Sequence, residues 1–141
     1  MHCPFCQLDK EKTRILFEGK HCKVILSNPR LMQAHLLVIP IKHVEKLSEL
    51  TKEELQELMD TVILFQEKIL KNLAPGCDIK HNYRPFQQQD KFKVHHLHIH
   101  LQPRFLEDEL YYKSQIFEKQ VFQDLTTEEM IKIQKIINAQ H

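Results

Sequence analysis

Glycine is scarce in this chain of 141 residues, which contains only Gly19 and Gly76. The two common glycine-rich phosphate loops each need several glycines at fixed spacings within one short segment. The composition therefore argues against a P-loop and against a Rossmann-type dinucleotide site.

Long apolar runs and an excess of one charge are also missing. The longest apolar runs, such as residues 36–41, are too short to span a bilayer. With 20 basic and 19 acidic side chains, the formal net charge of +1 gives no bulk attraction to nucleic acid or to an anionic membrane. The first residues show neither the basic nor the apolar region of a secretory signal. We expect a cytoplasmic protein without a membrane or nucleic-acid partner.

Cysteine is too sparse to suggest a disulfide framework in a reducing compartment. Of the four cysteines, only Cys3 and Cys6 lie close together, as Cys-Pro-Phe-Cys. This spacing suits a metal site or redox chemistry, and it also occurs as a pair of reduced thiols. The pair alone leaves all three interpretations open.

The apolar periodicity predicts one α+β domain with a mainly antiparallel sheet. Capping boxes of Thr51 with Glu54 and of Thr126 with Glu129 mark the starts of two helices. The first helix has an apolar face up to Leu73 and stops at Pro75-Gly76, and the second is short and C-terminal. The predicted strands are residues 14–17, 22–27, 35–41, 77–84 and 94–102.

Histidine is unusually common, with ten residues, four of them between His95 and His100. Side chains alternate between the two faces of a strand, so His96, His98, His100 and Gln102 are predicted to share one face. The apolar residues between them would pack against the long helix. The histidine face would then line a cleft or a metal site.

Three imidazoles about 6.5–7 Å apart along a strand can act together on one small ligand. Imidazole can be a nucleophile, an acid or a donor to phosphate oxygens at neutral pH. A His-rich polar strand and a pure metal site are the alternatives. The strict alternation, ended by Pro103, favours a catalytic cleft.

Two motifs resemble those of the histidine-triad (HIT) family. Residues 96–104, His-Leu-His-Ile-His-Leu-Gln-Pro-Arg, are similar to the triad signature His-φ-His-φ-His-φ-φ followed by Pro-Arg, where φ is apolar. Residues 34–44 resemble the family block Gly-His-x-Leu-Val-Ile-Pro-Lys-x-His-Val. The resemblance covers residues 3–104, including the Cys-x-x-Cys pair.

The resemblance implies a HIT-like fold, with a five-stranded antiparallel sheet and a long helix, usually paired as a two-fold dimer. We therefore expect a HIT domain over residues 1–104. Residues 105–141 form an extension, with an added C-terminal helix, that we expect to pack on the same domain. An open edge strand of a small sheet is a further reason to expect a homodimer.

The resemblance also implies a chemistry. His98 would attack the α-phosphate of a nucleotide derivative, with His100 and His35 as donors to phosphate oxygens and His96 beside them in the triad. The further substrate-binding residues that the resemblance indicates are Ser27, Asn28, Asn82 and Gln89. No organic cofactor is expected.

The chain departs from the family pattern in two informative places. The usual Gly-rich stretch before the triad is replaced by residues 82–93, where Arg84, Lys91 or Lys93 could supply positive charge. Gln102 stands where an apolar residue is expected, and it allows the His-x-His-x-Gln register of nucleotidyl transferases, with His100 as nucleophile. Pro103-Arg104 follows at the spacing that favours His98.

Bacterial-type HIT proteins with Cys-x-x-Cys complete a tetrahedral zinc site with two histidines. The corresponding residues here are Cys3, Cys6, His43 and His96, and structural Zn²⁺ is the implied cofactor. A redox role is less favoured, because no thioredoxin-like βαβ unit surrounds the cysteines.

The sequence thus predicts a nucleotide hydrolase or nucleotidyl transferase that acts through a covalent nucleotidyl-histidine. The implied substrate is a dinucleoside polyphosphate or a nucleoside phosphoramidate. The alternatives are a non-catalytic nucleotide-binding module and a metal-binding protein that uses the histidine cluster.

Overall fold

The computed structural model describes residues 3–7 and 14–139. The chain divides into two compact units, Met1–Asp108 and Glu109–His141. Each unit is described here by itself.

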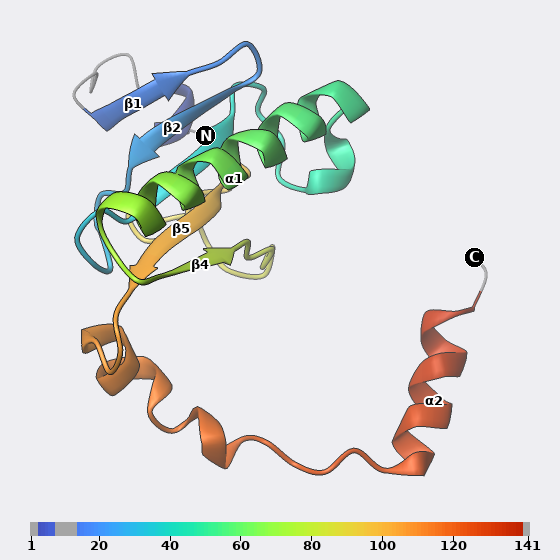
Figure 1. Cartoon of the computed structure of the whole chain (residues 1–141). Coiled ribbons are helices and arrows are strands. Elements are labelled where there is room, and N and C mark those ends of the chain that lie inside the picture. The colour runs from blue at the N-terminus through green and yellow to red at the C-terminus, as the bar shows by residue number, and fades with distance from the viewer. Residues whose placement is uncertain (1–2, 8–13, 140–141) are drawn as a thin grey trace. The chain divides into compact units, whose positions relative to one another are not determined.

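The first unit is built on a five-stranded sheet with the order β1-β2-β3-β5-β4, in which all neighbouring strands are antiparallel. β1 and β4 are therefore the two edges (Figure 1). The structure confirms the predicted antiparallel α+β fold. The strands are β1 (Ile15–Glu18), β2 (Cys22–Leu26), β3 (Leu36–Pro40), β4 (Gly76–Lys80) and β5 (Ile99–Arg104).

One long helix, α1 (Lys52–Asn72), lies across one face of the sheet (Figure 1). A short 3₁₀ turn, η2 (Leu47–Glu49), precedes it. The predicted capping box is confirmed, since Thr51 Oγ1 accepts from the Glu54 N–H and Glu54 Oε1 accepts from the Thr51 N–H. These bonds satisfy backbone donors that have no partner inside the helix, and so they fix where α1 begins.

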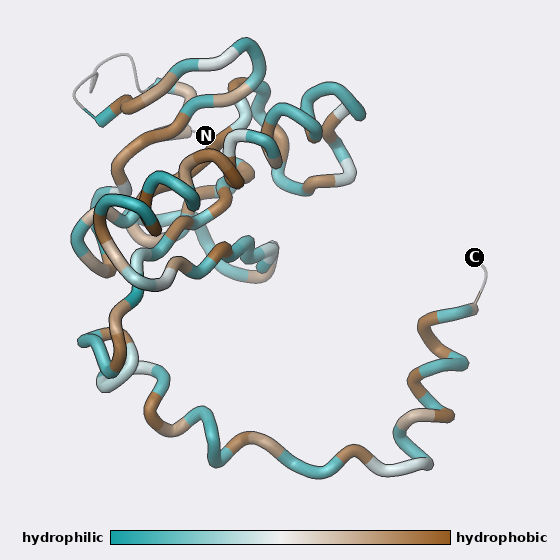
Figure 2. The backbone as a smooth tube through the Cα atoms, viewed as in Figure 1, coloured by the Kyte–Doolittle hydropathy of each residue, from teal (hydrophilic) through white to brown (hydrophobic). Residues whose placement is uncertain are grey.

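The sheet has an apolar cluster on each face, and the brown segments of Figure 2 follow its strands. Between the sheet and α1, Leu97, Ile99 and Leu101 pack with Leu58 and Val62, as the alternation predicts. On the opposite face, a smaller cluster consists of Phe5, Ile25, Leu37 and Ile39. The histidines lie on this second face.

β5 begins later than predicted, at Ile99, and continues to Arg104. The chain before it does not join the sheet, because the Leu97 N–H donates to the carbonyl of Val44 at 2.6 Å. His96 and His98 therefore precede the strand. β4 also ends earlier than predicted, at Lys80, since its last partner on β5 is His100.

The second unit contains a π-helical turn (Tyr111–Gln115), a 3₁₀ turn (Glu118–Gln120) and α2 (Thr127–Ile137). At the start of α2, Thr126 Oγ1 accepts from the Glu129 N–H at 3.2 Å, which is one of the two bonds of the predicted capping box. The predicted C-terminal helix is confirmed. The packing of this extension on the first unit stays a prediction.

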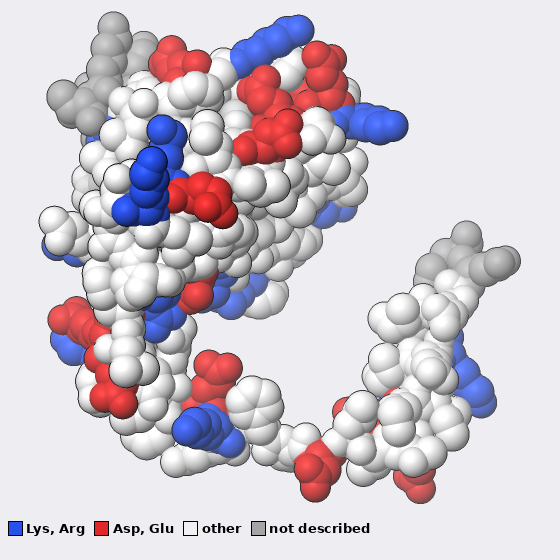
Figure 3. Space-filling model, in the orientation of Figure 1, with Lys and Arg blue, Asp and Glu red and all other residues white. Residues whose placement is uncertain are grey.

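Neither helix in the described part of the chain combines the length and the apolar composition needed to cross a bilayer. Figure 3 shows acidic side chains with lysines among them over the start of α1, where Glu53 and Glu54 occupy the first turn. Acidic side chains at a helix N-terminus interact favourably with the helix dipole.

Candidate active site and metal site

Two groups of side chains meet on the sheet face opposite α1. We call Cys3, Cys6, His43 and His96 the thiol–imidazole cluster. We call His35, His98 and His100 the triad cluster. The structure thus brings together the predicted metal ligands in one group and the predicted phosphate-contacting histidines in the other.

The thiol–imidazole cluster has one ligand atom per residue, and all four atoms lie within 4.8 Å of one another. His96 Nδ1 lies 3.4 Å from Cys3 Sγ, 3.6 Å from Cys6 Sγ and 3.1 Å from His43 Nδ1, and Cys6 Sγ lies 3.3 Å from His43 Nδ1. Tetrahedral zinc with bonds of about 2.0–2.3 Å would place its ligand atoms roughly 3.3–3.8 Å apart. The geometry and the donor set fit such an ion.

The second nitrogen of His96 supports this fit. His96 Nε2 lies 2.8 Å from the carbonyl oxygen of Pro40, which can only accept, so the Nε2–H donates to it. Nδ1 then carries the lone pair that points at the other three ligand atoms. A backbone carbonyl that fixes the tautomer of a ligating histidine is a regular feature of zinc sites.

The Cys6 thiol would hold its proton without a cation. Burial, a hydrogen bond to Cys3 and the charge of Cys3 raise the pKa of the Cys6 thiol to about 11. A bound divalent cation reverses this preference, because a coordinating thiol is deprotonated outright. Metal binding here would therefore release protons.

His98 is held by the backbone of the same segment. Its Nδ1 lies 2.6 Å from the carbonyl oxygen of His96, so the proton sits on Nδ1 and donates to that carbonyl. Nε2 is left with a lone pair. The ring also contacts Phe5 edge-on, with ring centroids 5.2 Å apart, and His100 at 4.9 Å.

The proton positions on His35 and His100 follow from one backbone contact. The Leu31 N–H donates to His35 Nδ1 at 3.1 Å, so the neutral ring of His35 carries its proton on Nε2. That Nε2–H lies 2.9 Å from His100 Nδ1 and donates to it. His100 Nδ1 is thus an acceptor, and its proton is on Nε2.

Ala34, which precedes His35, has a φ of 64°. This left-handed conformation costs an alanine roughly 1–2 kcal/mol, and the family block resembled by this segment has glycine there. The strained residue turns the chain immediately before the buried ring of His35, which is 3% exposed. Other contacts must therefore hold His35 in this position.

All three imidazoles of the triad cluster are neutral at neutral pH. Burial lowers the pKa of His35 to about 4, with contributions from His98 and Lys80. Burial, together with neighbouring charges, lowers the pKa of His98 to about 4 and that of His100 to about 3. The site therefore offers a free lone pair and a neutral N–H donor.

Two predicted substrate contacts lie in the segment before the triad. Asn82 lines a narrow hollow together with His98. Gln89 Oε1 accepts from the backbone N–H of His95 at 3.1 Å, so this oxygen helps to hold the loop.

The predicted ribose contacts follow β2. Ser27 Oγ donates to the carbonyl of Pro29 at 2.8 Å, and the Ser27 N–H donates to the carbonyl of His35 at 2.9 Å. This backbone hydrogen bond to His35 places Ser27 next to the triad cluster. Asn28 is the next residue and is exposed.

Sequence reasoning missed Phe5 and the backbone groups that fix the histidine protons. Phe5 lies between Cys3 and Cys6, so any contact that gathers the two cysteines beside His96 also carries Phe5 to the triad. The carbonyls of Pro40 and His96 leave no signal in a sequence, because every residue has such a group.

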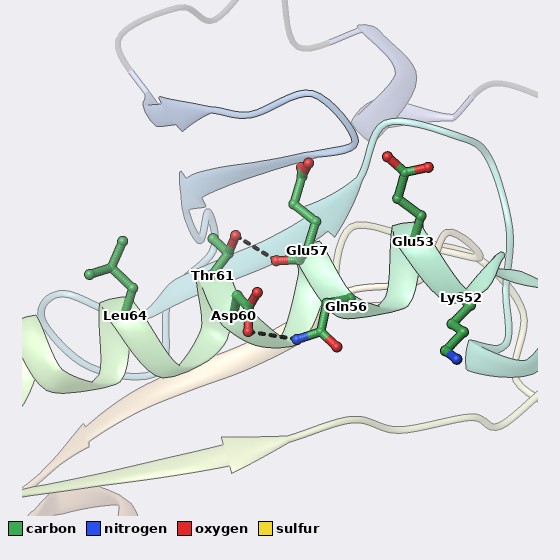
Figure 4. A pocket seen from close by; sticks show the side chains of 7 residues that line it. All are labelled: Lys52, Glu53, Gln56, Glu57, Asp60, Thr61 and Leu64. Carbon is green, nitrogen blue, oxygen red and sulfur yellow. Dashed lines mark hydrogen bonds between the residues drawn. The ribbon is translucent and has the colours of Figure 1, made fainter.

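A second, open hollow runs along the exposed side of α1 (Figure 4). Three of its polar side chains are engaged within the protein, since Gln56 donates to Asp60 at 2.9 Å and the Thr61 hydroxyl donates to the Glu57 carbonyl at 2.7 Å. No predicted site residue lines it. We therefore assign the chemistry to the histidine face.

Comparison with known proteins identifies the family of this chain. The HIT domain family matches residues 9–107. An uncharacterized HIT-like protein of Methanocaldococcus jannaschii is 30% identical over 106 residues, which cover 73% of this chain and 79% of that protein.

Solved structures extend the likeness. A HIT family protein from Bacillus anthracis matches with a TM-score of 0.70 and 25% identity, over 96% of this chain and 94% of that chain. A hypothetical histidine triad nucleotide-binding protein from Sulfolobus tokodaii matches with a TM-score of 0.64 and 25% identity, over 96% of this chain and 89% of that chain. The triad motif, the fold and the family match lead to one conclusion: this chain belongs to the HIT family.

Proposed function

We propose that the protein is a nucleotide hydrolase or nucleotidyl transferase that acts at an α-phosphate through a covalent nucleotidyl-histidine on His98. The observation that carries this proposal is the tautomer of His98. Its Nδ1–H donates to the His96 carbonyl at 2.6 Å, which leaves an unprotonated Nε2 as the nucleophile. Burial lowers the pKa of His98 to about 4, so this lone pair is free at neutral pH.

In the first step, the Nε2 lone pair forms a bond to the α-phosphorus. The bond from phosphorus to the leaving group breaks, and its electron pair goes to the leaving group. The positive charge that develops on the imidazole is stabilised by the His96 carbonyl. In the second step, the oxygen of water or of another acceptor forms a bond to phosphorus and loses its proton to solvent. The bond from phosphorus to Nε2 breaks, and its electron pair returns to Nε2. Such covalent catalysis divides one difficult displacement into two easier ones.

His100 is the donor to a phosphate oxygen through its Nε2–H. His35 acts through His100, because its Nε2–H occupies His100 Nδ1 and its own Nδ1 accepts from Leu31. His35 is thus a positioning residue in this proposal. A neutral N–H donor held before substrate arrives needs little reorganisation during the reaction.

The thiol–imidazole cluster binds structural Zn²⁺ in this proposal, and the ion would stabilise the fold. The His96 ring would hold the metal while its backbone carbonyl holds His98. Nucleotide is the proposed ligand, and the description of the Sulfolobus relative as nucleotide-binding supports it. We further propose a two-fold homodimer, which sedimentation as a 16.9 kDa monomer at micromolar concentration would contradict.

Trapping the intermediate tests the function. The protein is mixed with radiolabelled diadenosine triphosphate or adenosine 5′-phosphoramidate and quenched rapidly into base, because a phosphorylated histidine is acid-labile. Mass spectrometry should place one adenylyl group on His98. His98→Ala should lower turnover by at least about 10⁴-fold, as with other covalent nucleophiles, and keep its zinc.

His21→Gln is the matched control, since this histidine lies near Glu53 of α1, away from the triad. It should form the adduct at the normal rate. An adduct on His100, with normal turnover of His98→Ala, would show that the His-x-His-x-Gln register is correct. The absence of any adduct and of turnover with both substrates would refute an enzymatic function.

A further inference from the structure

Three cationic side chains lie beside the triad cluster. We call Lys80, Arg84 and Lys93 the cationic rim. Lys80 is the direct partner of His100 across β4 and β5, and directly opposed residues point to the same face of a sheet. Arg84 and Lys93 line the same narrow hollow as His98.

The rim is not balanced by carboxylates. Within the described part of the chain, no hydrogen bond or ion pair joins a rim side chain to an acidic one. Glu45 is the single described acidic residue that lines the hollow. The whole chain has a net charge of only +1, so this local excess is not a consequence of a basic protein.

The electrostatic effects on neighbouring groups are consistent with this placement of the cations. Burial and the charge of Arg84 lower the pKa of Lys93, and Glu45 only partly opposes this. Lys80 also contributes to the low pKa of His100. Like charges gathered around a cleft raise the local concentration of anions.

We propose that the cationic rim binds a further phosphate of the substrate, beside the phosphoryl group that His98 attacks. The preferred substrate is then a nucleotide with a phosphoanhydride leaving group rather than a phosphoramidate. This inference rests on the proposed function of His98. It assigns the role of the missing Gly-rich stretch to charged side chains of the segment that replaces it.

The chemistry of the leaving group explains the preference. When His98 Nε2 bonds to the α-phosphorus, the bond to the bridging oxygen breaks, and its electron pair remains on the departing phosphate. The rim stabilises this added negative charge in the transition state. The nitrogen of a phosphoramidate must instead gain a proton from solvent before it leaves as ammonia, and a nearby cation disfavours this positively charged, protonated nitrogen.

Two substrates with the same attacked phosphorus separate these cases. Diadenosine triphosphate and adenosine 5′-phosphoramidate are compared on wild type and on the double variant Arg84→Gln with Lys93→Gln. We expect kcat/KM for diadenosine triphosphate to fall about 10–100-fold, and that for the phosphoramidate to change less than about threefold. Lys80→Gln should also lower kcat/KM for diadenosine triphosphate more than that for the phosphoramidate, but by a smaller factor.

The control removes two positive charges elsewhere. The control variant is Lys68→Gln with Lys71→Gln. Both lysines lie on α1, which covers the other face of the sheet. This variant should change neither kcat/KM value by more than about twofold. Circular dichroism and thermal melts of each variant verify that it is folded.

A binding measurement tests the rim without turnover. Calorimetry on His98→Ala protein, without divalent cations, should show ATP binding at least about tenfold more tightly than AMP at low ionic strength. The rim substitutions, added to His98→Ala, should abolish this difference, and salt should reduce it.

The outcomes separate the two ideas. If wild type forms a nucleotidyl-histidine but the rim substitutions lower kcat/KM equally for both substrates, the rim inference is wrong and the proposed function stands. Equal binding of ATP and AMP would also overturn the rim inference. If no adduct forms although ATP is preferred, the rim binds phosphate and the proposed chemistry fails.

Discussion

The thiol–imidazole and triad clusters use the same residue type in opposite ways. In the first, the ligand atoms of two imidazoles and two thiols lie within 4.8 Å of one another, as metal ligands do. In the second, the histidine nitrogens are joined in a chain of hydrogen bonds, from the Leu31 N–H through His35 to His100. Within the triad cluster, only His98 Nε2 keeps a free lone pair.

The difference arises from the position of one proton on each ring. His96 donates through Nε2 to Pro40, whereas His98 donates through Nδ1 to the His96 carbonyl. Two backbone carbonyls thus give neighbouring histidines opposite tautomers. His96 also connects the clusters, because its ring belongs to one and its carbonyl supports the other. Substitutions in each cluster measure how far the two can be separated.

Cys3→Ser with Cys6→Ser should have the largest effect on stability. We expect zinc to fall from one ion per chain to near zero, and the free energy of unfolding to fall by about 3 kcal/mol or more, because metal binding is coupled to folding. Elemental analysis and denaturant unfolding measure both quantities. Cys77→Ser is the control and should retain the metal. Zinc that survives the double substitution would contradict the assignment.

Lowering the pH should weaken the fold through His35 and His100. Their folded pKa values, about 4 and about 3, lie below the ordinary 6.5, so their stabilising contribution is complete above pH 6.5. As the pH falls towards 4, the unfolded chain binds protons that the folded chain does not. The free energy of unfolding should then drop by up to about 1.4 kcal/mol per pH unit for each histidine.

Denaturant unfolding between pH 7 and pH 4.5 measures this slope. In the variant His35→Gln with His100→Gln, the free energy of unfolding should change less steeply with pH. The difference should correspond to up to two protons bound on unfolding, because the variant lacks both titrating rings. Other titrating groups contribute equally to both proteins. An unchanged slope would show that these rings titrate normally.

His35→Ala should lower kcat about 10–100-fold and change KM little, as expected when a supporting hydrogen bond to a reacting group is lost. His35→Gln should recover part of the loss, because its amide can still donate to His100 Nδ1. Steady-state kinetics supply both constants. A large rise in KM with normal kcat would instead indicate that His35 binds substrate directly.

Gln102→Leu should have the smallest effect and a stabilising one. Gln102 is 1% exposed, and its Oε1 has no hydrogen-bond partner among the described residues. Removing a buried polar atom without a partner should raise the free energy of unfolding by about 1 kcal/mol. Turnover should stay within about threefold of wild type. A loss of turnover similar to that of His98→Ala would support the rival His-x-His-x-Gln register.

Local sequence patterns predicted most of the fold. The Thr51 capping box and the three-to-four spacing defined α1, and strand alternation placed Leu97, Ile99 and Leu101 towards it. The same patterns placed the start of β5 too early, since His96 and His98 alternate as strand residues do but lie before the strand. Alternation shows which side chains share a face, whereas ladder formation depends on which backbone groups remain free.

The sequence by itself determined which residues we propose for the chemistry, because motif order and spacing identify the positions that match the family's histidines and cysteines. Only the tertiary structure brought Cys3 beside His96, across 93 positions, and decided where each imidazole proton lies. The physical reason is that tautomers are set by backbone donors and acceptors from distant segments, such as Pro40 and Leu31. These groups are identical in every residue except proline, which lacks only the N–H, so their positions are fixed by folding alone.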